Sequence, residues 1–208
     1  MNDKKQNREM IETIKSYGLY DEKIFGAMEK AKRHIFLPEY PPEDVYGDNP
    51  LPIGYGQTIS QPYTVAFMLY HLELRENLNV LEIGAGSGWN AALIKEIIDN
   101  GKVTTIEDEP ELAKRAKNIL AKLNYDIKVI NGNGAKGYPN NAPYDRIIVT
   151  CASPKIQSTW IEQLKEGGIL VAPIGEFVQT MIKAKKENGE LISQKLGNFR
   201  FVPLKGAE

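Results

Sequence analysis

Three glycines at alternate positions, Gly84, Gly86 and Gly88, follow the apolar run 80–83 and precede a segment with helical spacing. Glycines at such a turn let the backbone bend sharply and approach a ligand without an intervening Cβ. The helix that follows presents unpaired N–H groups and a positive dipole end to a negative group. Glu107 ends the next apolar run, where its carboxylate could accept hydrogen bonds from two ribose hydroxyls. This pattern indicates a ligand-binding loop.

The class of ligand follows partly from what the loop lacks. Trp89 stands where a dinucleotide-binding fingerprint has its third glycine, and no Gly-Lys-Ser/Thr follows as in a Walker motif. A nucleoside with little phosphate therefore fits better than NAD. S-adenosylmethionine is the leading candidate, because its carboxylate suits the helix N-terminus and its ribose suits Glu107. The alternative interpretation is a structural turn with Glu107 as a solvated strand end.

Composition excludes several other classes of protein. The 208 residues carry 26 basic and 27 acidic side chains, so a broad electrostatic grip on nucleic acid or anionic lipid is not expected. A single cysteine, Cys151, forms no internal disulfide, and the two histidines lack partners at metal-ligand spacing, so no metal site is predicted. Charged residues interrupt the first twenty positions, and no secretory signal core is expected there. We expect a cytoplasmic protein.

The elements that must position the loop alternate regularly after residue 79. Short apolar runs predict strands at 80–83, 103–106, 127–130, 146–150 and 169–174, and the segments between them predict helices near 89–99, 110–122 and 155–165. Strands that alternate with helices favour a parallel sheet covered on both faces. The segments 178–185 and 191–202 are joined by Asn188-Gly189, a strong hairpin signal. The predicted fold class is α/β, a doubly wound, mostly parallel sheet with an antiparallel edge hairpin.

The region before residue 79 has a different character. Helical spacing around 10–14 and after Asp21 predicts two helices, and Pro62 suits the first turn of a third. Between residues 36 and 62, six prolines and three glycines make a regular element unlikely, although a long loop inside a compact domain is usually functional. We expect one domain over 1–208, with helices and a loop in 1–78 and the ligand-binding sheet in 79–208.

Several segments together resemble the protein-L-isoaspartate O-methyltransferase family, a class I S-adenosylmethionine-dependent methyltransferase family. They are 33–38 (RHIFLP), 51–62 (LPIGYGQTISQP), the glycine loop, 142–147 (APYDRI), 163–168 (QLKEGG) and 201–204 (FVPL). The resemblance runs from about residue 33 to residue 206, and QTISQP is its most specific motif. It lies in the long loop whose purpose composition alone does not explain. The resemblance also implies a seven-stranded sheet.

The resemblance implies an enzyme that transfers a methyl group from S-adenosylmethionine to the free carboxylate of an isoaspartyl residue in a damaged protein. The ester then closes to a succinimide, which reopens partly as normal aspartate. Such a carboxylate is ionised at neutral pH and needs no general base. Partners would be isoaspartyl proteins and peptides; nucleic acid and membranes are not expected, and we expect a monomer.

The resemblance also implies residue roles. Ser60 is the active-site serine, with an orienting role rather than a nucleophilic one. The cofactor-binding residues would be Thr58, Ile59, Gly84, Ala85, Gly86, Gly88, Glu107, Asp108, Asn133 and Gly134. The substrate-binding residues would be Tyr55, Gln57, Val202 and Pro203.

One position departs from the family pattern. Asn133 stands where the family's Gly-Asp-Gly has an acid that accepts from the adenine amino group. The carbonyl oxygen of Asn133 could still accept this hydrogen bond. The bond would then be neutral rather than charge-assisted, which weakens it by about 1 kcal/mol. Two other functions stay open at this point: a methyltransferase that acts on aspartate during peptide maturation, and a protein that binds S-adenosylmethionine without turnover.

Overall fold

The computed structural model describes residues 3–206, and a seven-stranded sheet forms its centre. Its order is β5-β4-β3-β6-β7-β8-β9, in which β5 to β7 run parallel and β7, β8 and β9 pair antiparallel. The strands are β3 (Asn79–Ile83), β4 (Lys102–Glu107), β5 (Ile127–Asn131), β6 (Tyr144–Val149), β7 (Leu164–Ile174), β8 (Gln179–Glu187) and β9 (Glu190–Phe199). The predicted α/β fold class, with its antiparallel edge, is confirmed.

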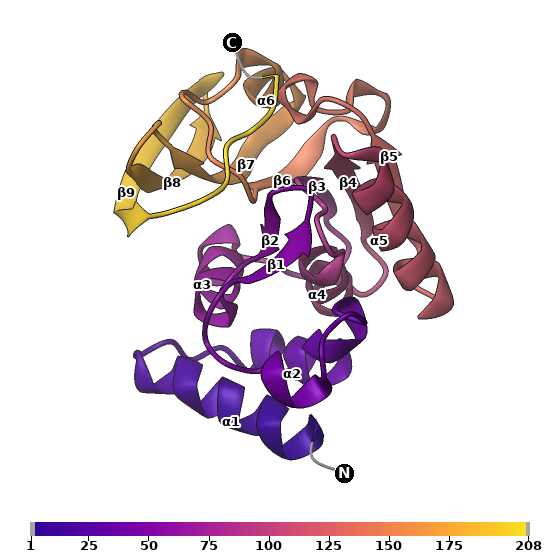
Figure 1. The fold of residues 1–208 in the computed structure, drawn as a ribbon. Coiled ribbons are helices and arrows are strands. Elements are labelled where there is room, and N and C mark those ends of the chain that lie inside the picture. The colour runs from indigo at the N-terminus through magenta and orange to yellow at the C-terminus, as the bar shows by residue number, and fades with distance from the viewer. Residues whose placement is uncertain (1–2, 207–208) are drawn as a thin grey trace.

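Helices cover both faces of this sheet (Figure 1). They are α1 (Asp3–Ser16), α2 (Glu22–Lys30), α3 (Pro62–Leu72), α4 (Trp89–Ile98), α5 (Pro110–Lys122) and α6 (Ser158–Gln163). The helices α3, α4 and α5 pack on one face and α6 on the other, while α1 and α2 form an outer layer against α3 and α4. No helix within residues 3–206 has both the length and the apolar character needed to cross a membrane.

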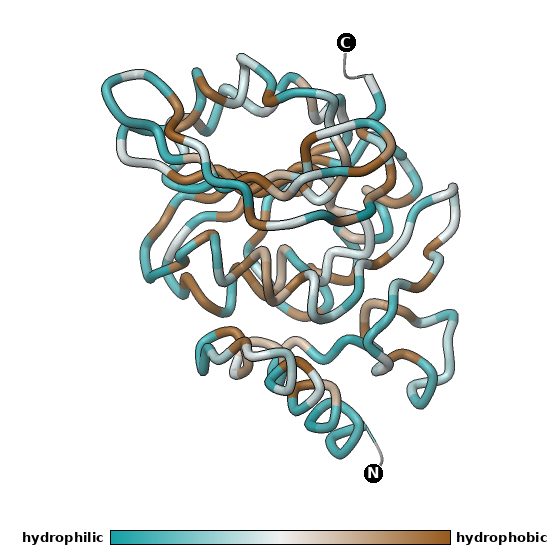
Figure 2. The backbone as a smooth tube through the Cα atoms, turned by 90° about the vertical axis from the view of Figure 1, so that its left-hand side faces the viewer, coloured by the Kyte–Doolittle hydropathy of each residue, from teal (hydrophilic) through white to brown (hydrophobic). Residues whose placement is uncertain are grey.

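The core divides into two apolar clusters because side chains alternate across the sheet. In β3, Val80 joins the cluster under α3 and α4, whereas Leu81 and Ile83 join the cluster under α6. Figure 2 shows apolar residues concentrated in the sheet and the adjacent helices, with hydrophilic residues on the outer turns of α1. Both faces of the central strands are therefore buried, as expected for a parallel sheet.

Local signals fix most element ends where the sequence predicts them. Asp21 accepts hydrogen bonds from the amides of Lys23 and Ile24 as the N-cap of α2, and the predicted helix 110–122 is confirmed as α5. Asn188 and Gly189 both take positive φ, 54° and 81°, as the tight turn between β8 and β9 requires. The predicted helix 155–165 is shorter, because it begins at Ser158 and the chain enters β7 at Leu164.

The proline-rich region 36–62 corrects one prediction. It contains a small antiparallel hairpin, β1 (Leu51–Gly54) and β2 (Gln57–Ile59), where no regular element was expected. Tyr55 and Gly56 form its turn at positive φ, 55° and 72°. Pro52 is tolerated because this is a separate two-stranded sheet whose strands are both edges. The second strand of the hairpin and the residue after it place Thr58, Ile59 and Ser60 beside the carboxyl ends of the strands of the large sheet.

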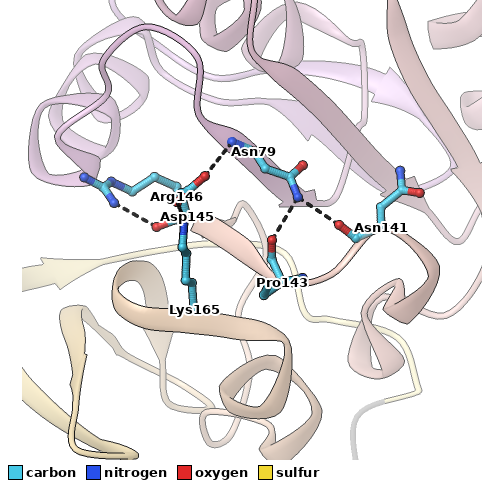
Figure 3. A network of polar contacts seen from close by, with 6 residues as sticks. All are labelled: Asn79, Asn141, Pro143, Asp145, Arg146 and Lys165. Atoms are coloured by element: carbon cyan, nitrogen blue, oxygen red, sulfur yellow. Dashed lines mark hydrogen bonds and ion pairs between the residues drawn. The ribbon is translucent and has the colours of Figure 1, made fainter.

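A polar network anchors the opposite end of the central strands (Figure 3). Asp145 accepts from the Asn79 amide at 2.9 Å and pairs with Lys165, while Arg146 donates to the carbonyls of Leu72 and Glu73. The Asn79 side chain donates to two further carbonyls, those of Asn141 and Pro143. Pro143, Asp145 and Arg146 of the family motif 142–147 take part in this network. The motif therefore helps to fix the register of β3 and β6, and none of its residues lines the two spaces described below.

Candidate active site

A narrow pocket opens at the carboxyl ends of β3, β4 and β6, the position where ligands bind in open parallel sheets. We call it the glycine-loop pocket. The predicted site residues that line it are Gln57, Thr58, Ile59, Ser60, Gly84, Ala85, Gly86, Glu107, Asp108, Gly134, Val202 and Pro203. The predicted residues outside its lining are Tyr55, Gly88 and Asn133. The structure adds polar lining residues that were not predicted, Ser87, Asn90, Thr150 and Lys205.

The glycine loop contains a tight turn in which Gly84 and Gly86 take positive φ, 98° and 51°, a conformation that favours glycine. A Cβ at Gly84 would collide with the Thr150 hydroxyl, which donates to the Gly84 carbonyl at 2.7 Å. Gly88 is the N-cap of α4 and lies against Ala116 of α5, so its small size serves helix packing. The loop backbone is thus exposed to the pocket and fixed from behind.

Glu107 forms the acidic wall of the pocket at the end of β4. Its side chain is buried, and its two carboxylate oxygens accept from the amides of Gly86 at 2.8 Å and Glu109 at 3.1 Å. Each carboxylate oxygen has a second lone pair, so the group can accept further hydrogen bonds from a ligand. The loop and the carboxylate therefore hold each other in a fixed arrangement beside the pocket.

A second carboxyl, Glu82, lies beneath the loop. It is fully buried and accepts from Asn90 at 2.7 Å and from the Thr105 hydroxyl at 2.5 Å. Burial raises its pKa to about 7, an effect that these two hydrogen bonds oppose and the charge of Glu107 reinforces. Glu82 supports Asn90, a lining residue, from the interior of the sheet.

The loop that carries Ser60 is held by a buried arginine. Arg33 donates to three backbone carbonyls, those of Val45 at 2.8 Å, Ser60 at 2.9 Å and Asn49 at 3.2 Å. Among residues 3–206 no carboxylate pairs with it. Burial lowers its pKa to about 9, which leaves the guanidinium charged at neutral pH.

Arg33 also connects this loop to the glycine loop. Its guanidinium stacks over the Trp89 ring at 4.8 Å, and the Trp89 indole donates to the Ala31 carbonyl at 2.8 Å. Trp89 is the first residue of α4 and lines the pocket. The sequence placed Arg33 in a family motif but gave it no role; a charged residue in the apolar context of 33–38 was the available signal.

The far end of the pocket is closed by the C-terminal segment 201–206. This segment pairs with the strand end after β6: the Leu204 amide donates to Ala152 at 2.7 Å, and Ala152 donates to Val202 at 2.8 Å. Asn133 accepts from the Ala135 amide at 2.8 Å and donates to the Gly206 carbonyl at 3.3 Å. The amide of Asn133 thus tethers the chain end, a bond that an aspartate could not donate.

A wider groove of about 910 Å³ adjoins the pocket. Thr58, Ser60, Thr150, Val202 and Pro203 line both spaces. We call it the aromatic groove, because its walls include rings from three separate parts of the chain. The residues that line only the groove are Tyr17, Pro50, Gln61, Tyr63, Thr64, Asn198, Phe199, Arg200 and Phe201. Tyr55 lies outside both spaces, on the exposed turn of the β1–β2 hairpin.

These contacts restrict the chemistry of the site. Burial raises the pKa of the Cys151 thiol to about 12, so it is not a thiolate at neutral pH. No group of three His, Cys, Asp or Glu side chains placed to hold a metal occurs in the part of the chain that the structure describes. The pocket does fit S-adenosylmethionine: a buried carboxylate for ribose hydroxyls, a helix N-terminus for the amino-acid end and an apolar wall from Ile106 and Leu204.

Comparison with known proteins agrees with this geometry. The family model of protein-L-isoaspartate(D-aspartate) O-methyltransferase matches residues 5–208. The chain is 47% identical over 207 residues to protein-L-isoaspartate O-methyltransferase 2 of Archaeoglobus fulgidus, covering 98% of this chain and 94% of that one. It is also 47% identical to the protein-L-isoaspartate O-methyltransferase of Methanoculleus marisnigri over 206 residues, covering 98% and 93%.

Two solved structures share the fold over almost the whole chain. A protein-L-isoaspartate O-methyltransferase superposes with a TM-score of 0.89 at 30% identity, covering 96% of this chain and 66% of that one. A Plasmodium falciparum protein assigned to the same activity, in complex with S-adenosyl-L-homocysteine, superposes with a TM-score of 0.85 at 25% identity, covering 96% and 98%.

Proposed function

The chain belongs to the protein-L-isoaspartate(D-aspartate) O-methyltransferase family, and from this we propose which of its residues perform the reaction. The enzyme transfers a methyl group from S-adenosylmethionine to the free carboxylate of isoaspartyl residues, which begins repair through a succinimide. The observation that carries our assignment is that Ser60 lies where the glycine-loop pocket and the aromatic groove join. The methyl donor and the damaged residue would meet there.

The nucleophile in this reaction is the substrate's own carboxylate, which is ionised at pH 7. The bound cofactor supplies an activated methyl group. The chain therefore has to place the carboxylate in line and to exclude water from it, rather than to remove a proton.

Ser60 would orient the carboxylate by donating a hydrogen bond from its hydroxyl. Its backbone carbonyl is fixed by Arg33 at 2.9 Å, so the serine cannot drift away from the junction. Thr58 and Thr150 also line both spaces and add hydroxyls beside it. We assign Ser60 a positioning contact with substrate, not a covalent role, because the carboxylate already is the nucleophile.

The cofactor contacts would divide between loop and strand ends. The backbone of Gly84 to Gly86 and the N-terminus of α4 would hold the methionine end, and Glu107 the ribose hydroxyls. Asp108 and Gly134, which line the pocket, would border the adenine. Asn133 lies behind that end, with its amide engaged by Ala135 and Gly206, so we assign it a supporting role at the adenine rather than a direct contact.

Methyl transfer from labelled S-adenosylmethionine to an isoaspartyl peptide and to its aspartyl twin tests this function. We expect labelling of the isoaspartyl peptide alone. Ser60→Ala should lower kcat while leaving the Kd for S-adenosylhomocysteine unchanged, and Ser60→Thr should keep part of the activity. Cofactor binding with no transfer to either peptide would contradict the function, and full activity of Ser60→Ala would contradict the role of Ser60.

We also infer that the chain acts as one domain and as a monomer in the cytoplasm, on protein substrates rather than nucleic acid or membranes. The near-balanced charge, 26 basic against 27 acidic residues, supports protein substrates rather than nucleic acid or membranes. The hydrogen bonds that join 1–78 to the sheet region, such as Trp89 to Ala31 and Arg146 to Leu72, support a single domain. Size-exclusion chromatography with light scattering tests the monomer.

A further inference from the structure

The aromatic groove is much larger than one isoaspartyl side chain needs. Its volume of about 910 Å³ is near the upper end of the roughly 300–1,000 Å³ typical of whole ligand sites. It continues outward from Ser60, where the damaged residue would lie, so its occupant would be the polypeptide on either side of that residue. The chemistry of its walls should therefore influence which damaged sequences are accepted.

One wall of the groove is aromatic. Tyr17, directly after α1, meets Tyr63 edge-on at 5.0 Å, and Phe67 links Tyr63 at 5.9 Å to Phe199 at 5.1 Å. The exposed fraction of Tyr17 is 54%, which is large for a ring so close to other rings. The exposed part of Tyr17 is therefore available to pack against a bulky side chain of a bound segment.

The charge in the groove comes from one residue. Arg200, exposed at the end of β9, is the single charged side chain among the described lining residues. Within residues 3–206 no carboxylate forms an ion pair with it. Asp48, the acid bonded to the groove residues Gln61 and Tyr63, does not line the groove, and its two carboxylate oxygens already accept from these residues. The groove is therefore suited to a negative side chain and unsuited to a positive one.

We propose that the aromatic groove is a subsite for residues flanking the isoaspartyl position, and that Tyr17 and Arg200 select segments with a bulky apolar side chain and an acidic one. This rests on the proposed function of Ser60. Because Tyr17 directly follows α1, the N-terminal region would take part in the choice of substrate. A site that contacted only the isoaspartyl residue would show no such preference for particular flanking residues.

Isoaspartyl hexapeptides with all-alanine flanks, substituted singly by Phe, Glu or Lys at two positions on either side, test the subsite by kcat/KM. We expect the best Glu peptide to exceed its Lys counterpart by about two- to fivefold, and added salt to reduce that ratio. The best Phe peptide should exceed the alanine peptide by about fivefold.

Three variants of groove residues and two matched controls outside the groove locate the effect. Arg200→Glu should reverse the Glu-over-Lys preference, and Tyr17→Ala should remove the Phe preference, while Tyr17→Phe keeps it. Lys195→Glu, on exposed β9, and Tyr20→Ala, 69% exposed, lie outside the groove and should change neither. The two control variants, Lys195→Glu and Tyr20→Ala, should methylate the alanine peptide at the same rate as the unsubstituted enzyme.

The outcomes separate this proposal from the function itself. Equal kcat/KM for all flanking residues, or preferences that survive Arg200→Glu and Tyr17→Ala, would overturn the subsite and leave the methyltransferase intact. Failure of the unmodified enzyme to methylate any isoaspartyl peptide would overturn both.

Discussion

The glycine-loop pocket and the aromatic groove share five residues, yet they are built differently. The pocket takes its polar groups from successive strand ends, β3, β4 and β6, and Glu107 and the Gly86 amide bond directly to each other. The groove takes its walls from the end of α1, the start of α3 and the end of β9. Its rings touch one another but share no hydrogen bonds.

This difference shows how the fold divides two requirements. A fixed ligand such as a nucleoside needs preorganised polar contacts, which the carboxyl edge of a parallel sheet supplies from short stretches of chain. Variable polypeptide segments need an open surface with tolerant contacts, which exposed rings supply. Arg33 connects the two regions although it lines neither: it donates to the carbonyl of Ser60, which lines both, and stacks on Trp89, which lines the pocket. Substitution of Arg33 should therefore affect both the glycine-loop pocket and the aromatic groove.

Arg33→Met carries the largest expected effect. It leaves three carbonyls, the buried one of Val45 and the partly buried ones of Asn49 and Ser60, without their donor, at a cost of about 3 kcal/mol in the free energy of unfolding. Urea unfolding measures this, with Arg75→Met on the exposed surface as the control. Arg33→Lys keeps a charge and some donors, so it should fold and show a lower kcat with both regions affected. A stable, fully active Arg33→Met would contradict the role of Arg33 in holding the Ser60 loop.

Glu82 gives the next effect, confined to the pocket side. Its pKa of about 7 in the folded state lies above the value of 4.5 for an exposed carboxyl, so between these pH values the folded protein holds a proton that the unfolded chain releases. The contribution of Glu82 to the free energy of unfolding is therefore greatest below about pH 4.5. It falls by about 3 kcal/mol as pH rises through 7.

Urea unfolding of Glu82→Gln from pH 5 to 8 tests this effect. The variant should lose that slope, because its side chain does not ionise, while Glu162→Gln at an exposed position should keep it. Identical pH profiles for Glu82→Gln and the unsubstituted protein would contradict burial as the cause.

Glu107→Gln should affect the glycine-loop pocket and leave the aromatic groove unchanged. Loss of charge-assisted bonds to ribose hydroxyls should weaken binding of S-adenosylhomocysteine by about 2 kcal/mol, or roughly thirtyfold. The KM for an isoaspartyl peptide at saturating cofactor should stay the same, because Glu107 does not line the groove. Calorimetry measures the first and steady-state kinetics the second, with exposed Glu111→Gln as the control. An unchanged Kd would remove the ribose assignment.

The same comparison explains what the sequence could predict. The glycine loop and Glu107 are readable because strand, turn and acid are near in sequence, and the period of apolar residues fixes their relative positions. Tyr17 and Arg200 carry no such signal, because only the packing of α1 on α3 and the return of β9 bring them together. The β1–β2 hairpin escaped prediction for a related reason: its prolines argue against strands, but a separate two-stranded sheet exposes both edges and tolerates them.

Asn133→Asp has the smallest expected effect and lies at the border of the pocket. The carboxylate cannot donate to the Gly206 carbonyl as the amide does at 3.3 Å, so hydrogen exchange in 201–206 should become faster. Once released from Gly206, the carboxylate can turn toward the adenine amino group, and this new charge-assisted bond, which the tethered amide does not make, should strengthen binding of S-adenosylhomocysteine by about 1 kcal/mol, roughly fivefold. The two changes have opposite consequences for the site, since one loosens the segment that closes the pocket and the other attracts its ligand. Faster exchange with unchanged affinity would mean that Asn133 serves the chain end alone, and that this enzyme has exchanged an adenine contact for a tether.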